Sequence, residues 1–214
     1  MNYKIDSLIP VYPSIKNDNF AKLIFKKEEF YSNRTPVTAI PLEKGSGDKY
    51  PQQQFLANFL SPFTPYNKMI VYHAMGQGKT CASIAISEVN KNRLYSKPTL
   101  VLVRGGSGVQ IFKKAIVNDC NKPGIYKPDS IKQYYEINTL QKFANNVSFP
   151  RDFDVYSDRV IIIDEAHNVR LNPEEGKDKK KEDLDSSRAE FAKIYNTIHR
   201  LLQNVKNKKI ILIT

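Results

Sequence analysis

The feature that most restricts the fold is an alternation of short apolar runs with segments of helical periodicity, which begins at Tyr50 and continues to Thr214. Four of the runs predict strands, at Lys68 to His73, Thr99 to Val103, Arg159 to Asp164 and Lys209 to Thr214, and Tyr134 to Asn138 is a weaker candidate. Such alternation is typical of βαβ units. The sequence therefore predicts an α/β fold, with a parallel sheet flanked by helices.

The segments between these runs predict the helices. Lys79 to Asn90 carries its apolar residues on one helical face, as does the segment containing Val109, Phe112 and Ile116. A longer helix is expected to begin at Ser187, where the Ser-x-x-Glu spacing to Glu190 forms a capping box. Residues 172–186, nearly all charged, predict a mobile surface loop ahead of it.

Length and composition suit one ordinary globular domain of 214 residues, with 41% hydrophobic and 26% charged residues. We expect residues 1–49 to be an N-terminal extension and residues 50–214 to be the domain itself. The apolar runs are far shorter than the roughly 18 residues of a membrane span, and residues 1–10 lack the pattern of a secretion signal. Cys81 and Cys120, 39 positions apart, indicate neither a disulfide framework nor a zinc site, which favours a reducing compartment.

The positive charge lies outside the lysine-rich segment. The chain has 33 Lys and Arg against 22 Asp and Glu, a net charge of +11, whereas Glu174 to Asp185 holds four lysines and six acidic residues. The excess is therefore spread over the rest of the chain. A basic surface suits a polyanion such as nucleic acid, whose phosphates attract it over long range, although simple solubility explains the charge equally well.

The strongest motif lies between the first predicted strand and the helix at Lys79. It comprises His73, Ala74, Met75, Gly76, Gln77, Gly78, Lys79 and Thr80. Backbone N–H groups of such a strand-to-helix turn cradle nucleotide phosphates, with a lysine reaching the β- and γ-phosphates and a Thr hydroxyl ligating Mg²⁺. The strict P-loop pattern has Gly where this sequence has His73, which is a departure from it.

A second motif ends the strand Val160 to Ile163 with two adjacent carboxylates, Asp164 and Glu165, and Asp164 lies 85 positions after Lys79. At the carboxyl edge of a parallel sheet, Asp164 would hold Mg²⁺ and Glu165 would polarise the water that attacks the γ-phosphate. The alternative is an ordinary buried strand with an acidic end. Together the two motifs favour a P-loop NTPase, with Glu165, Lys79 and Asp164 as catalytic residues.

Met75-Gly-Gln-Gly-Lys-Thr80 and Asp164-Glu-Ala-His167 together resemble the ATP-binding half of a superfamily 2 helicase with a DEAH-type motif. Ile9-Pro-Val-Tyr-Pro-Ser14, Leu60-Ser-Pro-Phe-Thr-Pro-Tyr66 and Asp164-Glu-Ala-His-Asn-Val-Arg170 look like the helicase-like ATPases of large nucleocytoplasmic DNA viruses, relatives of the poxvirus early transcription factor subunit and nucleoside triphosphatase. The resemblance spans nearly the whole chain. It implies a RecA-like P-loop domain, with ATP and Mg²⁺ as cofactors and DNA or RNA as partner.

The same resemblance assigns further residues. Gln53, with Gln54 as the alternative, matches the glutamine that reads adenine, although a Gln run is also a common helix start. The loop with Arg104, Gly105 and Ser107 matches a motif that touches the nucleic-acid backbone, as does Thr139, for which an ordinary turn is an equally good interpretation. His167 would couple the ATP site to neighbouring motifs.

The resemblance also indicates a missing partner. Lys208 to Thr214 matches the strand that leads into the family's third motif, so the second RecA-like domain and its arginine fingers would lie beyond these 214 residues. Because such fingers contribute about 10³ to 10⁵ in rate in related chemistry, we expect the fragment to bind ATP and hydrolyse it weakly.

The sequence thus predicts the ATP-binding half of a helicase or translocase. For a viral protein, the transcription machinery would be a further partner, and we expect no binding to a membrane. The expected location is then the host cytoplasm or the virion. Two alternatives remain open: the translocating subunit of a restriction system, and a non-catalytic truncated product that binds nucleotide.

Overall fold

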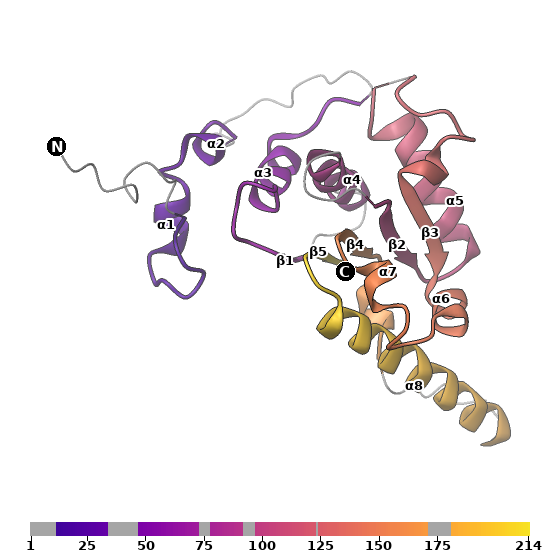
Figure 1. Ribbon diagram of the computed structural model, residues 1–214. Coiled ribbons are helices and arrows are strands. Elements are labelled where there is room, and N and C mark those ends of the chain that lie inside the picture. Colours follow the sequence, from indigo (N-terminus) through magenta and orange to yellow (C-terminus); the bar gives the residue numbers. More distant parts are fainter. Residues whose placement is uncertain (1–11, 34–46, 73–77, 92–96, 123, 171–180) are drawn as a thin grey trace.

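The computed structural model describes residues 12–33, 47–72, 78–91, 97–122, 124–170 and 181–214, with the side chains of the last range from residue 188 onward. Figure 1 shows a sheet with helices on both sides. The strands are β1 (Lys68–Val71), β2 (Thr99–Val103), β3 (Tyr135–Thr139), β4 (Arg159–Ile163) and β5 (Lys208–Ile213). All five predicted strands are present, each within two residues of its expected bounds.

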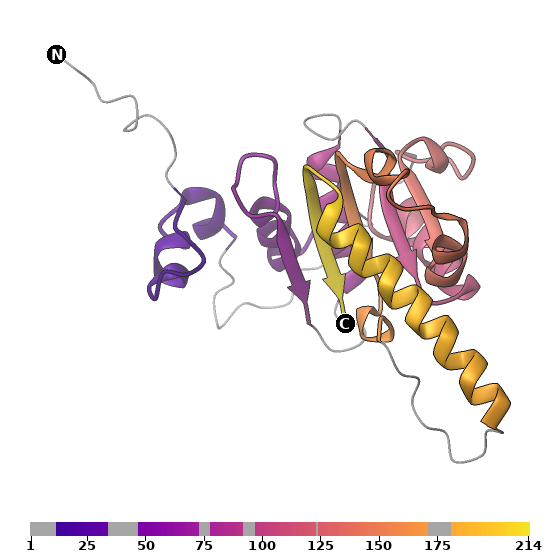
Figure 2. The ribbon, with the colours of Figure 1, turned by 60° about the horizontal axis from the view of Figure 1, so that its bottom comes forward.

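The sheet is wholly parallel in the order β1-β5-β4-β2-β3. The helices α3 (Pro51–Phe59), α4 (Lys79–Asn90) and α5 (Gly106–Lys114) cover one face, and α6 (Leu140–Asn146), α7 (Phe153–Tyr156) and α8 (Lys181–Asn204) lie on the other (Figure 1). The predicted α/β fold, a RecA-like parallel sheet flanked by helices, is confirmed. In Figure 2 the arrowheads of β1 and β5 end at one edge, beside the C-terminus.

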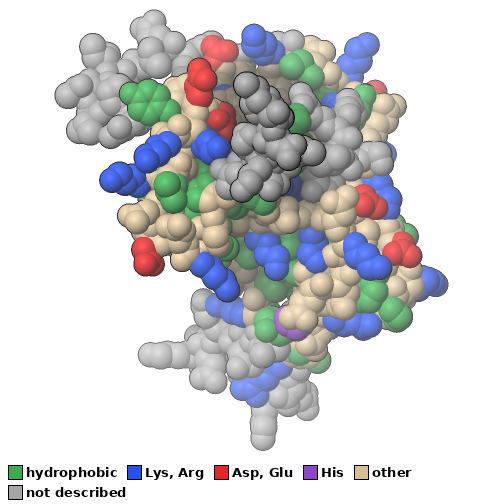
Figure 3. Space-filling model, turned by 60° about the vertical axis from the view of Figure 1, so that its left-hand side comes forward, with side chains coloured by type: hydrophobic (Ala, Val, Ile, Leu, Met, Phe, Trp, Pro, Cys, Tyr) green, Lys and Arg blue, Asp and Glu red, His purple; other side chains and the backbone are tan. Residues whose placement is uncertain are grey.

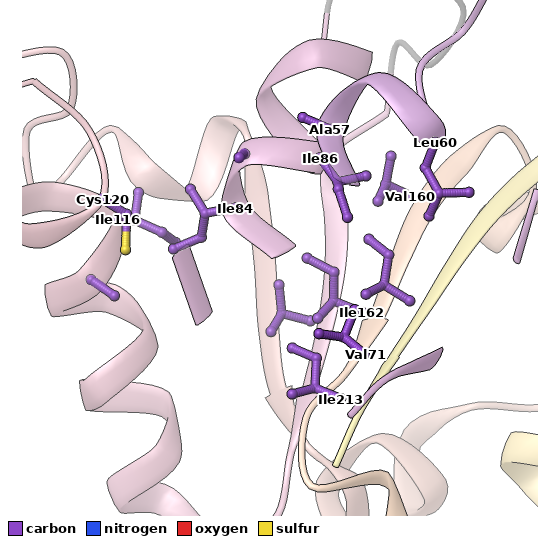
Figure 4. Packing of buried hydrophobic residues seen from close by; sticks show 14 of the residues in the cluster. Ala57, Leu60, Val71, Ile84, Ile86, Ile116, Cys120, Val160, Ile162 and Ile213 are labelled. Atoms are coloured by element: carbon purple, nitrogen blue, oxygen red, sulfur yellow. The ribbon is translucent and has the colours of Figure 1, made fainter. Parts of the chain in front are cut away.

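The core has two parts because successive residues of a strand point to opposite faces of the sheet. Val160 and Ile162 of β4 pack towards α3 and α4, together with Val101, Ile211 and other residues of that face, as Figure 4 shows in part. Ile161 and Ile163 pack against the cluster that includes α6 and α8. Every residue of β2 and β4 is buried, as expected for central strands of a parallel sheet covered on both faces.

The remaining short elements complete the chain order. Helices α1 (Phe20–Ile24) and α2 (Glu28–Tyr31) precede α3, a π-helical turn η2 (Ala115–Asp119) continues α5, and single turns η3 (Ile131–Gln133) and η4 (Ala166–Asn168) precede β3 and follow β4. No helix among the described residues is long and apolar enough to cross a membrane.

The described part of residues 1–49 packs against the domain. Ile24 and Phe30 belong to the same buried cluster as α3 and α4. The amide of Asn58 in α3 donates to the Glu29 carbonyl at 2.7 Å, and the Tyr66 hydroxyl donates to the Pro13 carbonyl at 2.7 Å. Residues 12–33 therefore extend the hydrophobic core, and the division at residues 49 and 50 remains a prediction.

Helix α8 corrects the expected start at Ser187. It begins at Lys181, six residues earlier, inside the segment predicted as a mobile loop. Lys, Glu and Leu are strong helix formers, so residues 181–186 can extend a helix that is anchored further on by Ile198 and Leu201 in the core. High charge excludes burial of a segment and does not exclude a solvated helix. Residues 172–180 of the predicted loop lie outside the described residues.

The cysteines correct a second expectation. Cys81 and Cys120 form a disulfide, with their Cα atoms 5.0 Å apart. Cys81 lies in the first turn of α4, and Cys120 directly follows η2, which packs against α4. The pairing depends on this packing, which the sequence separation of 39 positions does not predict. The two cysteines therefore give no support for a reducing compartment.

Candidate nucleotide-phosphate site

The candidate site lies where β1, β4 and β5 end. Parallel strands present their carboxyl ends at one edge, where loops leading into helices gather functional groups. Because β5 lies between β1 and β4, the end of β1, the Asp164-Glu165 pair after β4 and Thr214 after β5 come together there, and Lys79 contacts Thr214. The turn η4 lies at the same edge, near the C-terminus (Figure 2).

Gly78 and Lys79 begin the helix of the phosphate motif. Gly78 is the N-cap of α4 with φ 75°, a left-handed conformation that glycine adopts without steric cost. Lys79 and Thr80 occupy the first turn, where the helix dipole and free N–H groups favour an anion. The Lys79 ammonium donates to the Thr214 carbonyl at 3.2 Å. His73, Ala74, Met75, Gly76 and Gln77 lie outside the described residues.

Gln53 contacts this turn directly. Its side chain is buried, and its amide nitrogen donates to the Gly78 carbonyl at 3.3 Å while its oxygen accepts from the Tyr50 N–H at 2.9 Å. The second bond is the capping box of α3, so the helix-start interpretation and the proximity to the phosphate turn both hold. Gln54 instead donates to Asn58. Gln53 is therefore the one of the two beside the site, and its contact with adenine remains a prediction.

Asp164 is a partly buried carboxylate at the end of β4. Burial raises its pKa, and the neighbouring Glu165 carboxylate raises it further, while Lys79 and His167 lower it. The net pKa is raised above the usual value for aspartate. These causes place the charges of the two motifs within electrostatic reach of one another, which the separation of 85 positions in sequence could only suggest.

Glu165 has a positive φ of 52°, which is uncommon for a residue other than glycine. Strained backbone of this kind tends to occur at functional sites. Its side chain is about half exposed, and its Oε2 lies 3.3 Å from His167 Nδ1. His167 Nδ1 also lies 3.2 Å from the Thr214 hydroxyl. Glu165, His167 and Thr214 therefore form a contiguous polar group.

Two residues at this edge were not predicted from the sequence as site residues. Thr214 contacts both Lys79 and His167, and Asn168 is buried with its amide nitrogen 2.9 Å from the Glu165 carbonyl. Thr214 could have been found from the strand order, since it directly follows β5, the strand between β1 and β4. Nothing in the sequence distinguishes Asn168 from an ordinary turn residue.

The residues predicted to contact nucleic acid lie together at the carboxyl ends of the next two strands. Val103 of β2 is in register with Thr139 of β3, so the loop that follows β2 adjoins Thr139. Arg104 and Ser107 are exposed there, and Gly105 is the N-cap of α5. The Thr139 hydroxyl accepts from the Lys142 N–H at 3.1 Å and caps α6, which supports the turn interpretation of this residue. Contact with nucleic acid remains a prediction.

The fold and the site define a class: an α/β protein whose parallel sheet carries a phosphate-binding turn and an acidic pair at one edge. Residues 47–214 match the family described as "Type III restriction enzyme, res subunit". The chain belongs to this family, and its resemblance to superfamily 2 helicases is confirmed. The DEAH-type assignment of the second motif and the closer relation to poxvirus proteins remain predictions.

Three of the curated relatives are viral proteins that are several times longer than this chain. The chain is 27% identical to "Putative helicase 087L" of Invertebrate iridescent virus 3 over its whole length, which is 23% of that protein. It is 27% identical to "Putative helicase 009L" of Frog virus 3, over 72% of the chain and 17% of that protein. It is 26% identical to "Putative ATP-dependent RNA helicase L377" of Acanthamoeba polyphaga mimivirus, over 76% of the chain and 20% of that protein. The chain thus spans about a fifth of these relatives, and no solved structure matches it.

Proposed function

We propose that this chain is the ATP-binding half of a nucleic-acid helicase or translocase, which couples hydrolysis of Mg²⁺-bound ATP to movement along DNA or RNA. The observation that carries the proposal is the chain of contacts at one sheet edge from Lys79 through Thr214 and His167 to Glu165, which directly follows Asp164. Family membership supports a helicase-type ATPase, and viral relatives named as helicases support a role in viral transcription or replication.

The residues present fit ATP and Mg²⁺. A carboxylate and a hydroxyl are the hard oxygen ligands that Mg²⁺ prefers, and Asp164 and Thr80 supply one of each. Lys79 at the N-terminus of α4 provides positive charge for phosphate oxygens. The raised pKa of Asp164, caused first by burial, is also consistent with a carboxylate that lacks a full set of protein partners.

In the proposed reaction Glu165 orients a water so that its oxygen attacks the γ-phosphorus as the bond to the β-γ bridging oxygen breaks. The proton of the water passes towards the carboxylate, and the charge that develops on the phosphoryl oxygens and leaving group faces Lys79. Metal bound at Asp164 and Thr80 would neutralise phosphate charge. A second RecA-like domain, part of the proposal for the whole protein, would complete the site.

Nucleic acid would be held by its backbone. Arg104, with the exposed N–H groups and hydroxyl around Gly105 and Ser107, suits phosphate contacts that position a strand and read no bases. On the face turned forward in Figure 3, Lys and Arg side chains are spread across the surface. Replacement of Arg104 by Ala should weaken binding to all sequences alike and lower the salt dependence by about one counterion.

The decisive experiment measures ATP binding and hydrolysis by the 214-residue chain, with and without single-stranded DNA or RNA. Lys79→Ala should abolish ATP binding, and Glu165→Gln should keep binding while losing hydrolysis. Lys114→Ala and Glu28→Gln, both at exposed helix positions, are the matched controls. Unchanged affinity in Lys79→Ala would contradict the assignment. If the chain binds ATP but does not hydrolyse it in the presence of nucleic acid, even with a second domain supplied, the non-catalytic alternative would be favoured.

A further inference from the structure

The side chain of Asn168 lies beneath the turn that carries Glu165. It is 8% exposed, and its Nδ2 lies 2.9 Å from the Glu165 carbonyl and 3.2 Å from His167 Nε2. The backbone N–H of Asn168 also donates to the Glu165 carbonyl at 2.9 Å. One residue therefore contacts both the strained peptide of the acidic pair and the neighbouring ring.

These contacts determine which end of the amide faces the turn. A main-chain carbonyl can only accept, so the atom of Asn168 that meets the Glu165 carbonyl must be the NH₂ nitrogen. That nitrogen carries two protons, of which one is directed to the carbonyl. The other is available to His167 Nε2. Because Nε2 then accepts, the proton of the neutral imidazole must reside on Nδ1.

Two hydrogen-bond acceptors lie near His167 Nδ1 and can accept that proton's hydrogen bond. Glu165 Oε2 lies 3.3 Å from Nδ1 and the Thr214 hydroxyl oxygen lies 3.2 Å from it, and both can accept. In the opposite tautomer, the Nε2 proton would meet the Asn168 N–H groups, and the Nδ1 lone pair would face the carboxylate. Both encounters are repulsive, so the surroundings favour one tautomer from each side.

We propose that Asn168 is a positioning residue, which fixes His167 in its Nδ1–H tautomer and so holds the carboxylate of Glu165 by the Nδ1–H donor. The other carboxylate oxygen of Glu165, Oε1, then remains available to accept a hydrogen bond from the attacking water. The inference rests on the proposed function, because Glu165 is useful in this state only if it orients that water. At metal centres, a residue that fixes the tautomer of a ligating histidine is a recurring device, and its loss costs about 10- to 100-fold in affinity or activity.

The tautomer is measured directly, without ATP, by NMR of the chain labelled with ¹⁵N-histidine, because protonated and unprotonated ring nitrogens have distinct shifts. His73, His167 and His199 are the only histidines, so His167→Gln and His199→Gln assign the signals. We expect the proton of His167 on Nδ1. In Asn168→Asp the carboxylate accepts where the amide donated, so Nε2 should become protonated. An Nε2–H ring in the unsubstituted chain would overturn the proposal.

The catalytic consequence is measured as kcat and KM for ATP. Asn168→Asp should lower kcat at least tenfold, and the uncharged Asn168→Ala should leave KM within about twofold, because none of the residues proposed to hold ATP is altered. Where Asn168→Asp fails to give a folded protein, judged by near-ultraviolet circular dichroism, Asn168→Ala serves: it should raise the share of the Nε2–H tautomer and give an intermediate kcat. A shifted tautomer with unchanged kcat would overturn the positioning role.

Helix α8 offers a matched control. The Gln203 amide nitrogen lies 2.9 Å from His199 Nε2, the same pairing at an exposed position. Gln203→Glu should shift the His199 tautomer and leave kcat unchanged. The two proposals also fail separately: an Nδ1–H ring at His167 in a chain that does not hydrolyse ATP contradicts the proposed function and upholds the effect of Asn168 on the ring.

Discussion

Lys209 is a buried cation whose titration should be visible in the stability of the protein. It is 2% exposed in β5, and its ammonium donates to the Tyr66 carbonyl at 2.7 Å and the Thr64 carbonyl at 3.2 Å. Burial lowers its pKa from 10.5 to about 8. Lys209 thus connects β5 to the loop before β1. Both β1 and β5 lead to the candidate site.

The sign follows from proton binding. Between pH 8 and 10.5 the unfolded chain keeps the proton on Lys209 and the folded chain releases it, so the free energy of unfolding rises with pH. With 2.303RT of about 1.4 kcal/mol per pH unit, these pKa values give a gain of about 2 kcal/mol from pH 7 to 9.5. Lys209→Met removes the titrating group and should lose that gain.

The assay is urea unfolding at pH 7 and 9.5, with the gain in the free energy of unfolding compared between variants. Comparison with the unsubstituted chain subtracts the groups that both share, including tyrosines such as Tyr12, whose pKa is raised to about 12 by burial and by Glu29. Lys209→Arg, which stays charged, should also lose the gain. Lys114→Met, at an exposed position of α5, should keep it. An equal gain in Lys209→Met and the unsubstituted chain would refute the reasoning.

Three further predictions concern packing and covalent links. Reductant should lower the free energy of unfolding by about 4 kcal/mol through loss of the Cys81–Cys120 loop closure and leave Cys120→Ser unchanged in the same urea titration; equal sensitivity of both would contradict the disulfide. Ile162→Ala, at a fully buried position, should cost about 2 to 5 kcal/mol in that assay, and a cost under 1 kcal/mol would contradict close packing around β4. Tyr66→Phe removes the bond to the Pro13 carbonyl and should cost about 1 kcal/mol while speeding amide hydrogen exchange in residues 20–31; unchanged exchange would argue against anchoring by this bond.

The sequence was sufficient for the strands because their apolar runs are dictated by burial on both faces of the sheet. Val160 to Ile163 could hardly be anything other than a central strand, and α4 was placed at its observed bounds. The start of α8 was missed because hydrophobic periodicity records burial, and residues 181–186 are too polar for that signal. The disulfide was missed because spacing in sequence does not report the packing of α4 against η2.

The site was predictable in its parts and unpredictable in its connections. Lys79 and the Asp164-Glu165 pair are recognisable because phosphate and metal chemistry demands those residue types after a strand. Their relation depends on the strand order, which places β5 between β1 and β4. Whatever residue ends β5 must then lie between the two motifs, and Thr214 accordingly contacts Lys79 through its carbonyl and His167 through its hydroxyl. A change at this strand end would reach both motifs at once, which no comparison of the motifs alone could reveal.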